Sequence, residues 1–267
     1  MGLRDQLKKR EERREKAANG GINGGLPEGV TRYVRLSTEL KGEGKPFVIL
    51  RDPDLWYFYY VHEAGDFATR QTYIKKHTCL NSPRKAPETI EEAEEMFAKF
   101  EKPNPNVCIS DKAKAKRGLY FMVPVFDPEY NEWRVLDFKE FHVSNLINDM
   151  DKTEKAARKF DKSYTMIGDV VVIRKSADGK SYTIESSDME DDKAAKVKDD
   201  AAKVDQSEID YEELANFREE SDIIAILHEA HDDHVDKSVL PAVESAQPQD
   251  EATPIPSDAD APPEDDF

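Results

Sequence analysis

Aromatic side chains in this sequence repeatedly stand beside Lys or Arg, and this pairing points to one kind of chemistry. A flat ring stacks on a nucleic-acid base, and a neighbouring cation neutralises the phosphates that join the bases. A protein that binds a single strand without reading its sequence needs both groups. The pattern therefore predicts a surface for single-stranded nucleic acid. The residues that carry it are Arg32, Tyr33, Arg35, Arg51, Tyr57, Tyr59, Tyr73, Lys75, Lys76, Lys114, Lys116, Arg117, Tyr120, Trp133 and Arg134.

The densest group of rings lies in the segment WYFYYVH at residues 56–62. Successive side chains of a β-strand point to opposite faces. Tyr57 and Tyr59 therefore share one face, and Trp56, Phe58 and Tyr60 share the other. A register error of one residue would exchange the two faces, so alternation alone leaves open which face binds.

Runs of β-branched and aromatic residues between turn signals predict a mainly β protein with helical insertions. Closure of these strands by non-local pairing predicts an OB-fold, a Greek-key barrel of about five or six strands. The expected strands lie at residues 30–36, 47–50, 55–62, 117–126, 133–138, 170–174 and 180–185, and the expected helices at residues 89–100, 144–160 and 208–229.

Charge is distributed unevenly along the chain, whose net charge is −17. Residues 187–267 contain 26 acidic and 6 basic residues, a net of −20, which leaves residues 1–186 with 30 acidic and 33 basic residues, a net of +3. This asymmetry is typical of a binding core with an acidic interaction tail. We therefore expect a basic arm with a Gly-rich hinge at residues 1–26, an OB-type core at 27–186, and an acidic, largely disordered tail at 187–267.

The last four residues of the sequence are Glu264, Asp265, Asp266 and Phe267. A flexible acidic tether that ends in an aromatic ring and a carboxylate suits a basic pocket on another protein. These residues are therefore predicted to bind partner proteins.

Motifs for catalysis are missing from the sequence. It contains no P-loop, no Gly-x-Ser-x-Gly and no paired Cys/His site, and we expect no enzymatic activity. It also lacks the pattern of a signal peptide and any apolar run of about 18 residues. We therefore expect an intracellular protein without membrane association, with Cys79 and Cys108 as reduced thiols.

Several segments, taken in order, resemble the bacteriophage single-stranded DNA-binding proteins of the T-even helix-destabilising type. They are PEGVTRYVRL, KPFVIL, YYVHEAG, a Cys-containing insertion, RGLYFMVPVFDPEYNEWRVLDFKEFHVSNLIND, IGDVVVIRKSADGKSYTIE and the acidic tail. The resemblance covers about residues 1–190.

That resemblance implies an OB-fold core that coats single-stranded DNA during replication, recombination and repair in the cytoplasm of a bacterial host. It implies that the tail contacts replication and recombination proteins. It also implies cooperative self-association through the basic arm, although the family's Lys-Arg-Lys-Ser-Thr type of element has no close copy here. The arm residues that would carry this role are Arg4, Lys8, Lys9, Arg10, Arg13 and Arg14.

The same family often carries a structural zinc ion bound by one His and three Cys. This chain offers His62, His77, Cys79 and Cys108, without a Cys-x-x-Cys pair. Because structural zinc sites usually have closely spaced ligands, we predict no metal and no other cofactor.

Two other functions fit the same sequence features. The first is a single-stranded RNA-binding or RNA-chaperone protein, because stacking on bases does not exclude ribose. The second is a scaffold or inhibitor whose acidic tail mimics nucleic acid while the barrel contacts only protein.

Overall fold

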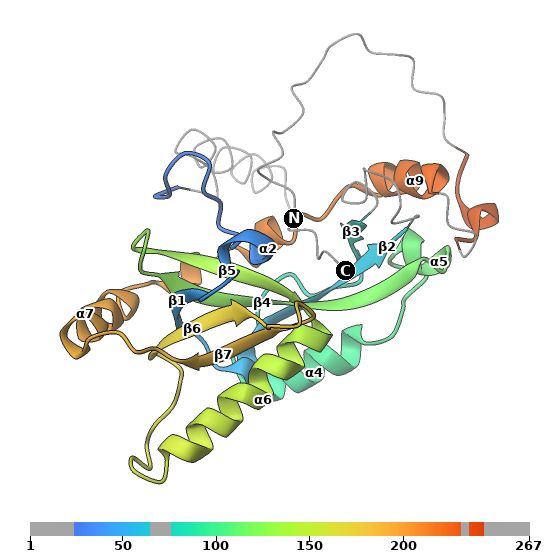
Figure 1. Ribbon diagram of the computed structural model, residues 1–267. Coiled ribbons are helices and arrows are strands. Elements are labelled where there is room, and N and C mark those ends of the chain that lie inside the picture. The colour runs from blue at the N-terminus through green and yellow to red at the C-terminus, as the bar shows by residue number, and fades with distance from the viewer. Residues whose placement is uncertain (1–23, 65–75, 231–234, 243–267) are drawn as a thin grey trace, which may run out of the picture.

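The computed structural model describes residues 24–64, 76–230 and 235–242. Its centre is an antiparallel sheet of seven strands, with α-helices packed around it (Figure 1), so the fold is mixed α/β. The strands are β1 (Lys45–Ile49), β2 (Tyr57–Glu63), β3 (Lys76–Thr78), β4 (Lys116–Asp127), β5 (Glu132–Lys139), β6 (Val170–Lys175) and β7 (Tyr182–Ser186). The α-helices are α2 (Leu36–Glu39), α4 (Ile90–Phe100), α5 (Ile109–Lys112), α6 (Glu140–Ala157), α7 (Asp191–Ala201), α8 (Tyr211–Leu214) and α9 (Glu220–Glu229), and the 3-10 helices are η2 (Pro53–Leu55), η3 (Gln206–Glu208) and η4 (Lys237–Val239).

Strand β4 joins the two halves of the sheet. Along one edge it pairs with β5, and along the other its first half pairs with β2 and its second half with β1. Pro124 lies at this changeover, where its carbonyl accepts a hydrogen bond from Leu50 N at 3.1 Å. In an antiparallel strand the N–H and C=O of one residue face the same edge. The N–H that proline lacks would therefore face the gap between β2 and β1, so this central strand tolerates a proline.

The sheet is not closed into a barrel, which corrects the barrel part of the sequence-based prediction. The strand order is β3-β2-β4-β1-β6-β7, with β5 beside β4. The segment predicted as a strand at residues 30–36 runs beside β5 as irregular chain, where Val34 N donates to the carbonyl of Val135 at 2.9 Å. At the other end of the sheet α6 packs against β7, where Asn145 donates to the Ser181 hydroxyl at 2.7 Å. The extended segment thus borders β5, and helix α6 borders β7.

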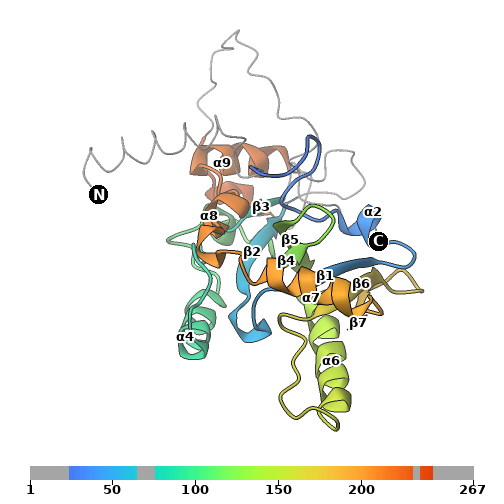
Figure 2. The ribbon, with the colours of Figure 1, turned by 90° about the vertical axis from the view of Figure 1, so that its left-hand side faces the viewer.

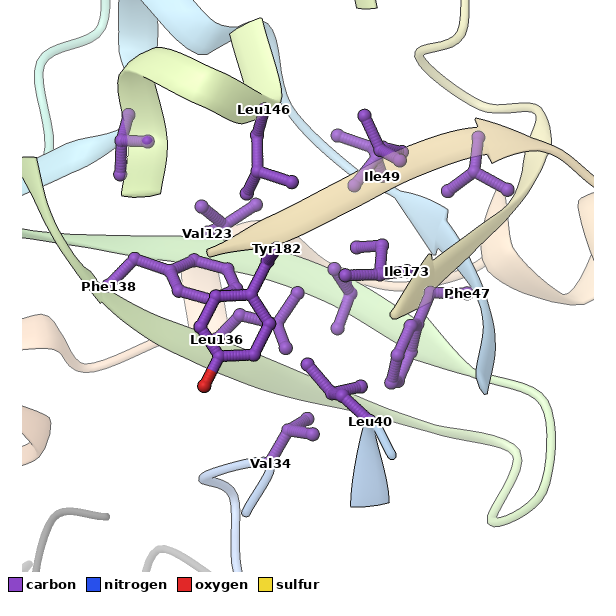
Figure 3. Close-up of a cluster of buried hydrophobic side chains, with 14 of the residues drawn as sticks. Val34, Leu40, Phe47, Ile49, Val123, Leu136, Phe138, Leu146, Ile173 and Tyr182 are labelled. Carbon is purple, nitrogen blue, oxygen red and sulfur yellow. The ribbon is translucent and has the colours of Figure 1, made fainter. Parts of the chain in front are cut away.

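The main core lies between α6 and the inner side of the sheet (Figure 3). Leu146 of α6 packs over side chains from β1, β4, β5, β6 and β7, and Leu40, which follows α2, closes the far side. Burying these side chains is the principal stabilisation of the sheet, because each fully buried Leu, Ile or Phe contributes about 1.5–3 kcal/mol. The sheet residues in this core include Phe47, Ile49, Val123, Val125, Leu136, Phe138, Val171, Ile173, Tyr182 and Ile184.

The predicted helices in the central part of the chain and both predicted hairpins are confirmed. Helix α4 begins after Thr89, whose hydroxyl accepts a hydrogen bond from Glu92 N at 3.1 Å and so caps the first turn. Helix α6 begins four residues earlier than the predicted residue 144. The β6–β7 hairpin turns at Gly179, whose φ of +70° is a conformation that glycine adopts without strain.

The acidic segment after residue 186 is folded over residues 187–230 and 235–242, and this corrects the prediction of a largely disordered tail for that part. It forms α7, η3, α8, α9 and η4 around the sheet (Figure 2). The helix predicted at residues 208–229 is divided into α8 and α9 by Asn216, whose φ is +49°. The two halves pack in different places, since Tyr211 and Leu214 lie on the sheet while Ile223 and Leu227 lie against α5.

Candidate nucleic-acid interface and candidate metal centre

Four tyrosines gather on the outer side of the sheet, the side opposite the main core. Tyr33, Tyr57, Tyr59 and Tyr120 form this tyrosine face. Tyr57 and Tyr59 alternate on β2, and Tyr120 stands opposite Tyr59 on β4. The ring centroids of Tyr57 and Tyr59 are 5.7 Å apart with planes 14° apart, and those of Tyr59 and Tyr120 are 5.9 Å apart. A row of rings thus crosses two neighbouring strands.

The tyrosine face is closed to solvent in this conformation. Tyr57, Tyr59 and Tyr120 are only 0%, 4% and 7% exposed. Their hydroxyls are used within the fold, since Tyr57 donates to the carbonyl of Pro83 at 2.8 Å and Tyr59 donates to the carboxylate of Asp137 at 2.9 Å. Burial, reinforced by the Asp137 charge, raises the pKa of Tyr59 well above its usual value. The tyrosine rings predicted to stack on bases are therefore inaccessible to nucleic acid unless the chain that covers them moves away.

Residues 204–217, here called the cover segment, shield the tyrosine face. The Tyr211 ring stacks on Tyr57, with centroids 4.8 Å apart and planes 26° apart. The Tyr33 hydroxyl donates to the carbonyl of Leu214, and the Thr78 hydroxyl donates to the carbonyl of Ala215. The cover segment is therefore held by one ring stack on β2 and by hydrogen bonds from β3 and from the irregular segment that contains Tyr33.

Charged contacts at one border of the tyrosine face also involve the cover segment. Glu212 lies 3.5 Å from the Arg84 guanidinium, and that guanidinium lies 3.4 Å above the ring of Phe217. At the other end, Gln206 donates to the carbonyl of Leu50 at 2.7 Å. Arg84 was not among the residues singled out by their aromatic neighbours, because its ring partner lies far along the chain. Arg84 stands beside Lys85, and this pair of cations is the signal that the sequence offers for it.

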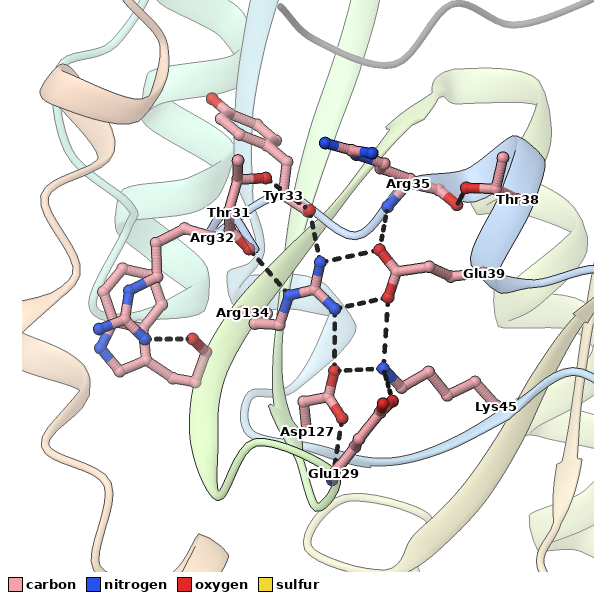
Figure 4. A network of polar contacts seen from close by, with 11 residues as sticks. Thr31, Arg32, Tyr33, Arg35, Thr38, Glu39, Lys45, Asp127, Glu129 and Arg134 are labelled. Carbon is pink, nitrogen blue, oxygen red and sulfur yellow. Dashed lines mark hydrogen bonds and ion pairs between the residues drawn. The ribbon is translucent and has the colours of Figure 1, made fainter. Parts of the chain in front are cut away.

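Arg134, predicted at the nucleic-acid surface, lies inside the fold (Figure 4). It is 1% exposed and donates to Glu39 at 2.6 Å and to Asp127 at 2.9 Å. Lys45 completes the network at 2.8 Å from Asp127. Burial opposes the charged form of Glu39, but the hydrogen bonds from Arg134 outweigh it and lower the pKa of Glu39 to about 2. The sequence-based role for Arg134 is corrected, because its donors are occupied by acidic side chains and carbonyls.

Arg32 and Trp133 are likewise used to hold the chain together. The Arg32 guanidinium lies 3.9 Å above the Trp133 ring and donates to the carboxylate of Glu132 at 2.9 Å. Both side chains are buried. Their pairing of ring and cation is thus internal, which corrects their predicted place on the binding surface.

The remaining predicted cations are at least partly exposed. Arg35, Lys114 and Lys116 are exposed, and Arg51, Lys76 and Arg117 are half-buried. Arg117 is the most constrained of them, because it lies 3.5 Å above the Tyr60 ring and donates to the carbonyl of Phe100 at 2.6 Å. The predicted residues that lie outside the described residues are Tyr73, Lys75, the six arm residues Arg4, Lys8, Lys9, Arg10, Arg13 and Arg14, and the tail residues Glu264, Asp265, Asp266 and Phe267.

A second site is built from four buried side chains with metal-binding atoms. His62 of β2, Cys79 after β3, Cys108 before α5 and Asp111 within α5 place one such atom each within 4.8 Å of the others. His62 Nε2 lies 3.3 Å from Asp111 Oδ1 and 3.6 Å from Cys108 Sγ, and Cys79 Sγ lies 3.8 Å from Asp111 Oδ2. The cluster joins the end of the sheet to the insertion between β3 and β4.

The donor set fits a tetrahedral zinc ion, for which Cys, His and Asp are all usual ligands. His62 Nδ1 lies 3.2 Å from the carbonyl of Ala115, so a proton on Nδ1 leaves Nε2 facing the cluster. A hydrogen bond from Cys79, opposed by burial and aided by His62, lowers the pKa of Cys108 and favours its thiolate. The same bond and burial raise the pKa of Cys79, so a bound metal would have to displace the Cys79 proton. Arg117, 3.8 Å from Asp111, offsets part of the negative charge.

This ligand set differs from the residues that the sequence offers for zinc. His77 stands beside the cluster, with its ring centroid 5.5 Å from that of His62, but its Nε2 lies 2.7 Å from the Ser110 hydroxyl. Asp111 takes the fourth position instead. Sequence spacing could not reveal this ligand set, because the four residues lie up to 49 positions apart in the chain. They meet through the β2–β3 register, in which His62 pairs with His77, and through the turn before α5.

In the described part of the chain, no helix is both long and apolar enough to cross a bilayer. The chain matches no protein-family model, no curated protein and no solved structure.

Proposed function

We propose that this protein binds single-stranded DNA without catalysing a reaction, and that the tyrosine face is its binding surface once the cover segment has moved away. The observation that carries the proposal is the chemistry of the cover segment's own contacts. The cover segment places the Tyr211 ring on Tyr57 and the Glu212 carboxylate beside Arg84. These are the two contacts that a base and a phosphate would make.

The acidic composition of the cover segment also supports the proposal that it occupies the DNA-binding surface. Its 14 residues include five acidic residues and no Lys or Arg. A segment with this charge competes with a polyanion for the same cations, and added salt weakens both interactions. Helix α8 within it has only four residues, so its opening resembles the local unfolding of a short element rather than of the whole domain.

Under this proposal Tyr57, Tyr59 and Tyr120 stack on bases, and Arg51 and Arg84 lie where phosphates pass. Each stacked base contributes about 1–3 kcal/mol, and this free energy opposes the loss of the cover segment's contacts. The protein would coat single strands during replication, recombination and repair, as the resemblance to the T-even type implies. The acidic end at residues 264–267 would then recruit partner proteins.

The decisive experiment compares a cover-release variant with the wild type in binding to a fluorescently labelled oligothymidylate. Tyr211→Ala removes the competing ring, so DNA affinity should rise by about fivefold or more. Ile226→Ala is the matched control, because it truncates a buried side chain of α9 rather than one on the tyrosine face. Circular dichroism verifies that both variants are folded.

Three outcomes would contradict the proposal. Folded Tyr211→Ala protein with wild-type affinity would show that the cover segment does not compete with DNA. A wild-type protein that fails to bind the oligonucleotide even at low salt would exclude DNA binding. Tighter binding to a matched RNA oligomer would favour an RNA-binding protein instead.

We propose, as a second and independent role, that His62, Cys79, Cys108 and Asp111 hold a structural zinc ion. Zinc would cross-link strand β2, the end of β3 and helix α5, and so reinforce the β2–β3 pairing and the contact of His77 with Ser110 of α5. Metal analysis of protein purified without chelator should find about one zinc per chain. Asp111→Asn should lose zinc while His77→Gln keeps it, and the reverse result would overturn the ligand assignment.

A further inference from the structure

The end of α6 carries an aromatic side chain that is almost wholly in water. Phe160 is 95% exposed, the highest value among the large apolar side chains of the described residues. An exposed phenyl ring brings no packing energy to the fold. The other exposed large apolar side chains of the described residues lie on or after α4 or at the first turn of α6, so Phe160 is not grouped with them into a broad apolar patch of the kind that binds proteins.

The chain around Phe160 is held in place by hydrogen bonds. Phe160 N donates to the carbonyl of Ala157 at 2.9 Å. Arg158 pairs with Glu154 and donates to the carbonyl of Tyr164 at 2.9 Å. Glu154 also accepts from Met166 N at 2.8 Å, which ties the returning chain to the helix. These hydrogen bonds fix the turn that holds the Phe160 ring in solvent.

Positive charge surrounds this ring in a chain whose net charge is −17. Residues 152–162, here called the α6 tip, contain five Lys or Arg and two acidic residues, a net of +3. Lys155, Lys159 and Lys162 are exposed and form no ion pair with any residue that the structure describes. Asp161, the acidic residue next to the ring, is also exposed, and its carboxylate accepts from Ser163 N at 2.9 Å.

We infer that the α6 tip is a second contact site for single-stranded nucleic acid, where a base stacks on Phe160 and phosphates lie beside Lys159 and Lys162. A lone ring among unpaired cations offers both contacts that a single strand needs. An anionic membrane surface would need more than one apolar side chain to enter it. This inference rests on the proposed function and extends it to a second place on the molecule.

The position of the tip sets a length requirement. Helix α6 has 18 residues and therefore a length of about 27 Å. Its first turns are buried by Val143, Leu146 and Met150 in the main core, on the side of the sheet away from the tyrosine face. Its far end projects from the body (Figures 1 and 2). A single-stranded nucleic acid bound at the tyrosine face must therefore extend beyond the edge of the β-sheet to reach the α6 tip.

The test measures the affinity of the full chain for two labelled oligothymidylates, of about 8 and about 30 nucleotides, below and above the usual span of one binding domain. Phe160→Ala should leave the affinity for the short oligomer unchanged and lower that for the long one by about fivefold or more. Phe141→Ala is the matched control, because Phe141 is a 62% exposed phenyl ring at the other end of the same helix. It should bind both oligomers as the wild type does.

A second pair of variants tests the charges. The double variant Lys159→Gln with Lys162→Gln should reduce the slope of log affinity against log salt for the long oligomer by about 1.4, which corresponds to two phosphate contacts. The double variant Lys41→Gln with Lys180→Gln changes the net charge equally at other exposed positions and should leave the slope near that of the wild type.

Long-oligomer affinity that is equal in the wild type and in Phe160→Ala would overturn the inference while the proposed function stands. Equal losses in Phe160→Ala and Phe141→Ala would also overturn it. Failure of the wild type to bind either oligomer would remove the proposed function and this inference with it. If Phe160→Ala lost binding to anionic vesicles but kept the wild-type affinity for DNA, the α6 tip would be assigned to a membrane surface instead.

Discussion

Replacing Arg134 by methionine should destabilise the protein strongly although this arginine lies among the predicted DNA contacts. The substitution keeps most of the side-chain length but removes five donors from the network with Glu39 and Asp127. Asp127 is buried and would keep Lys45, 2.8 Å away, as its remaining cationic partner in that network. Removing one partner of a buried ion pair costs about 3–5 kcal/mol.

The lowered pKa of Glu39, to which Arg35 N and Lys45 also contribute, points to a cost of the same order. Burial would raise that pKa, but the hydrogen bonds of Arg134 lead the opposing contributions and bring it from 4.5 to about 2. A fall of this size corresponds to about 3 kcal/mol. Because the pKa is depressed in the folded state, the stabilisation is present above pH 4.5 and is lost as the pH falls towards 2. We therefore expect a loss of about 3 kcal/mol at neutral pH that shrinks in acid.

Urea unfolding followed by tryptophan fluorescence and far-UV circular dichroism measures this difference at neutral pH and at about pH 3. Arg35→Met is the control, because Arg35 is an exposed arginine close to the same Glu39 and should change stability by less than about 0.5 kcal/mol. Equal effects of the two substitutions at neutral pH would refute the reasoning. So would an Arg134→Met loss that stays constant between the two pH values.

Three further predictions concern the tyrosine face, one turn and the metal cluster. Tyr59→Phe removes the hydroxyl that donates to Asp137 and should destabilise the fold by about 1–3 kcal/mol in a urea titration, whereas an unchanged midpoint would show that this bond contributes nothing. Gly44→Ala should lower the melting temperature, because a Cβ atom there would lie 2.5 Å from the carbonyl oxygen of Ile173 and φ is +79°; a melting temperature equal to that of the wild type would contradict the close approach. A chelator should lower the melting temperature of the wild type but not that of Cys108→Ser, and equal sensitivity of the two would argue against the cluster as the metal site.

Local patterns accounted for a large part of the secondary structure. Alternation within WYFYYVH placed Tyr57 and Tyr59 on one face of a strand, because the two-residue period of a strand depends only on neighbouring residues. The turn around Gly179 and the cap at Thr89 are likewise decided within a few positions. The barrel was wrong because closure depends on which edges meet, and no short segment carries that information.

What only the tertiary structure decided is how distant segments combine. The covering of Tyr57 by Tyr211 joins residues 154 positions apart, and the bond between Arg134 and Glu39 spans 95 positions. The sequence predicted a helix at residues 208–229 within a largely disordered acidic tail, but it did not show where that helix would pack, because the rings that receive Tyr211 and Leu214 lie elsewhere in the chain. The sequence alone shows the tyrosines of the proposed binding surface, but not that Arg32, Trp133 and Arg134 lie inside the fold. Whether that surface is open or covered depends on packing between segments, which local sequence does not encode.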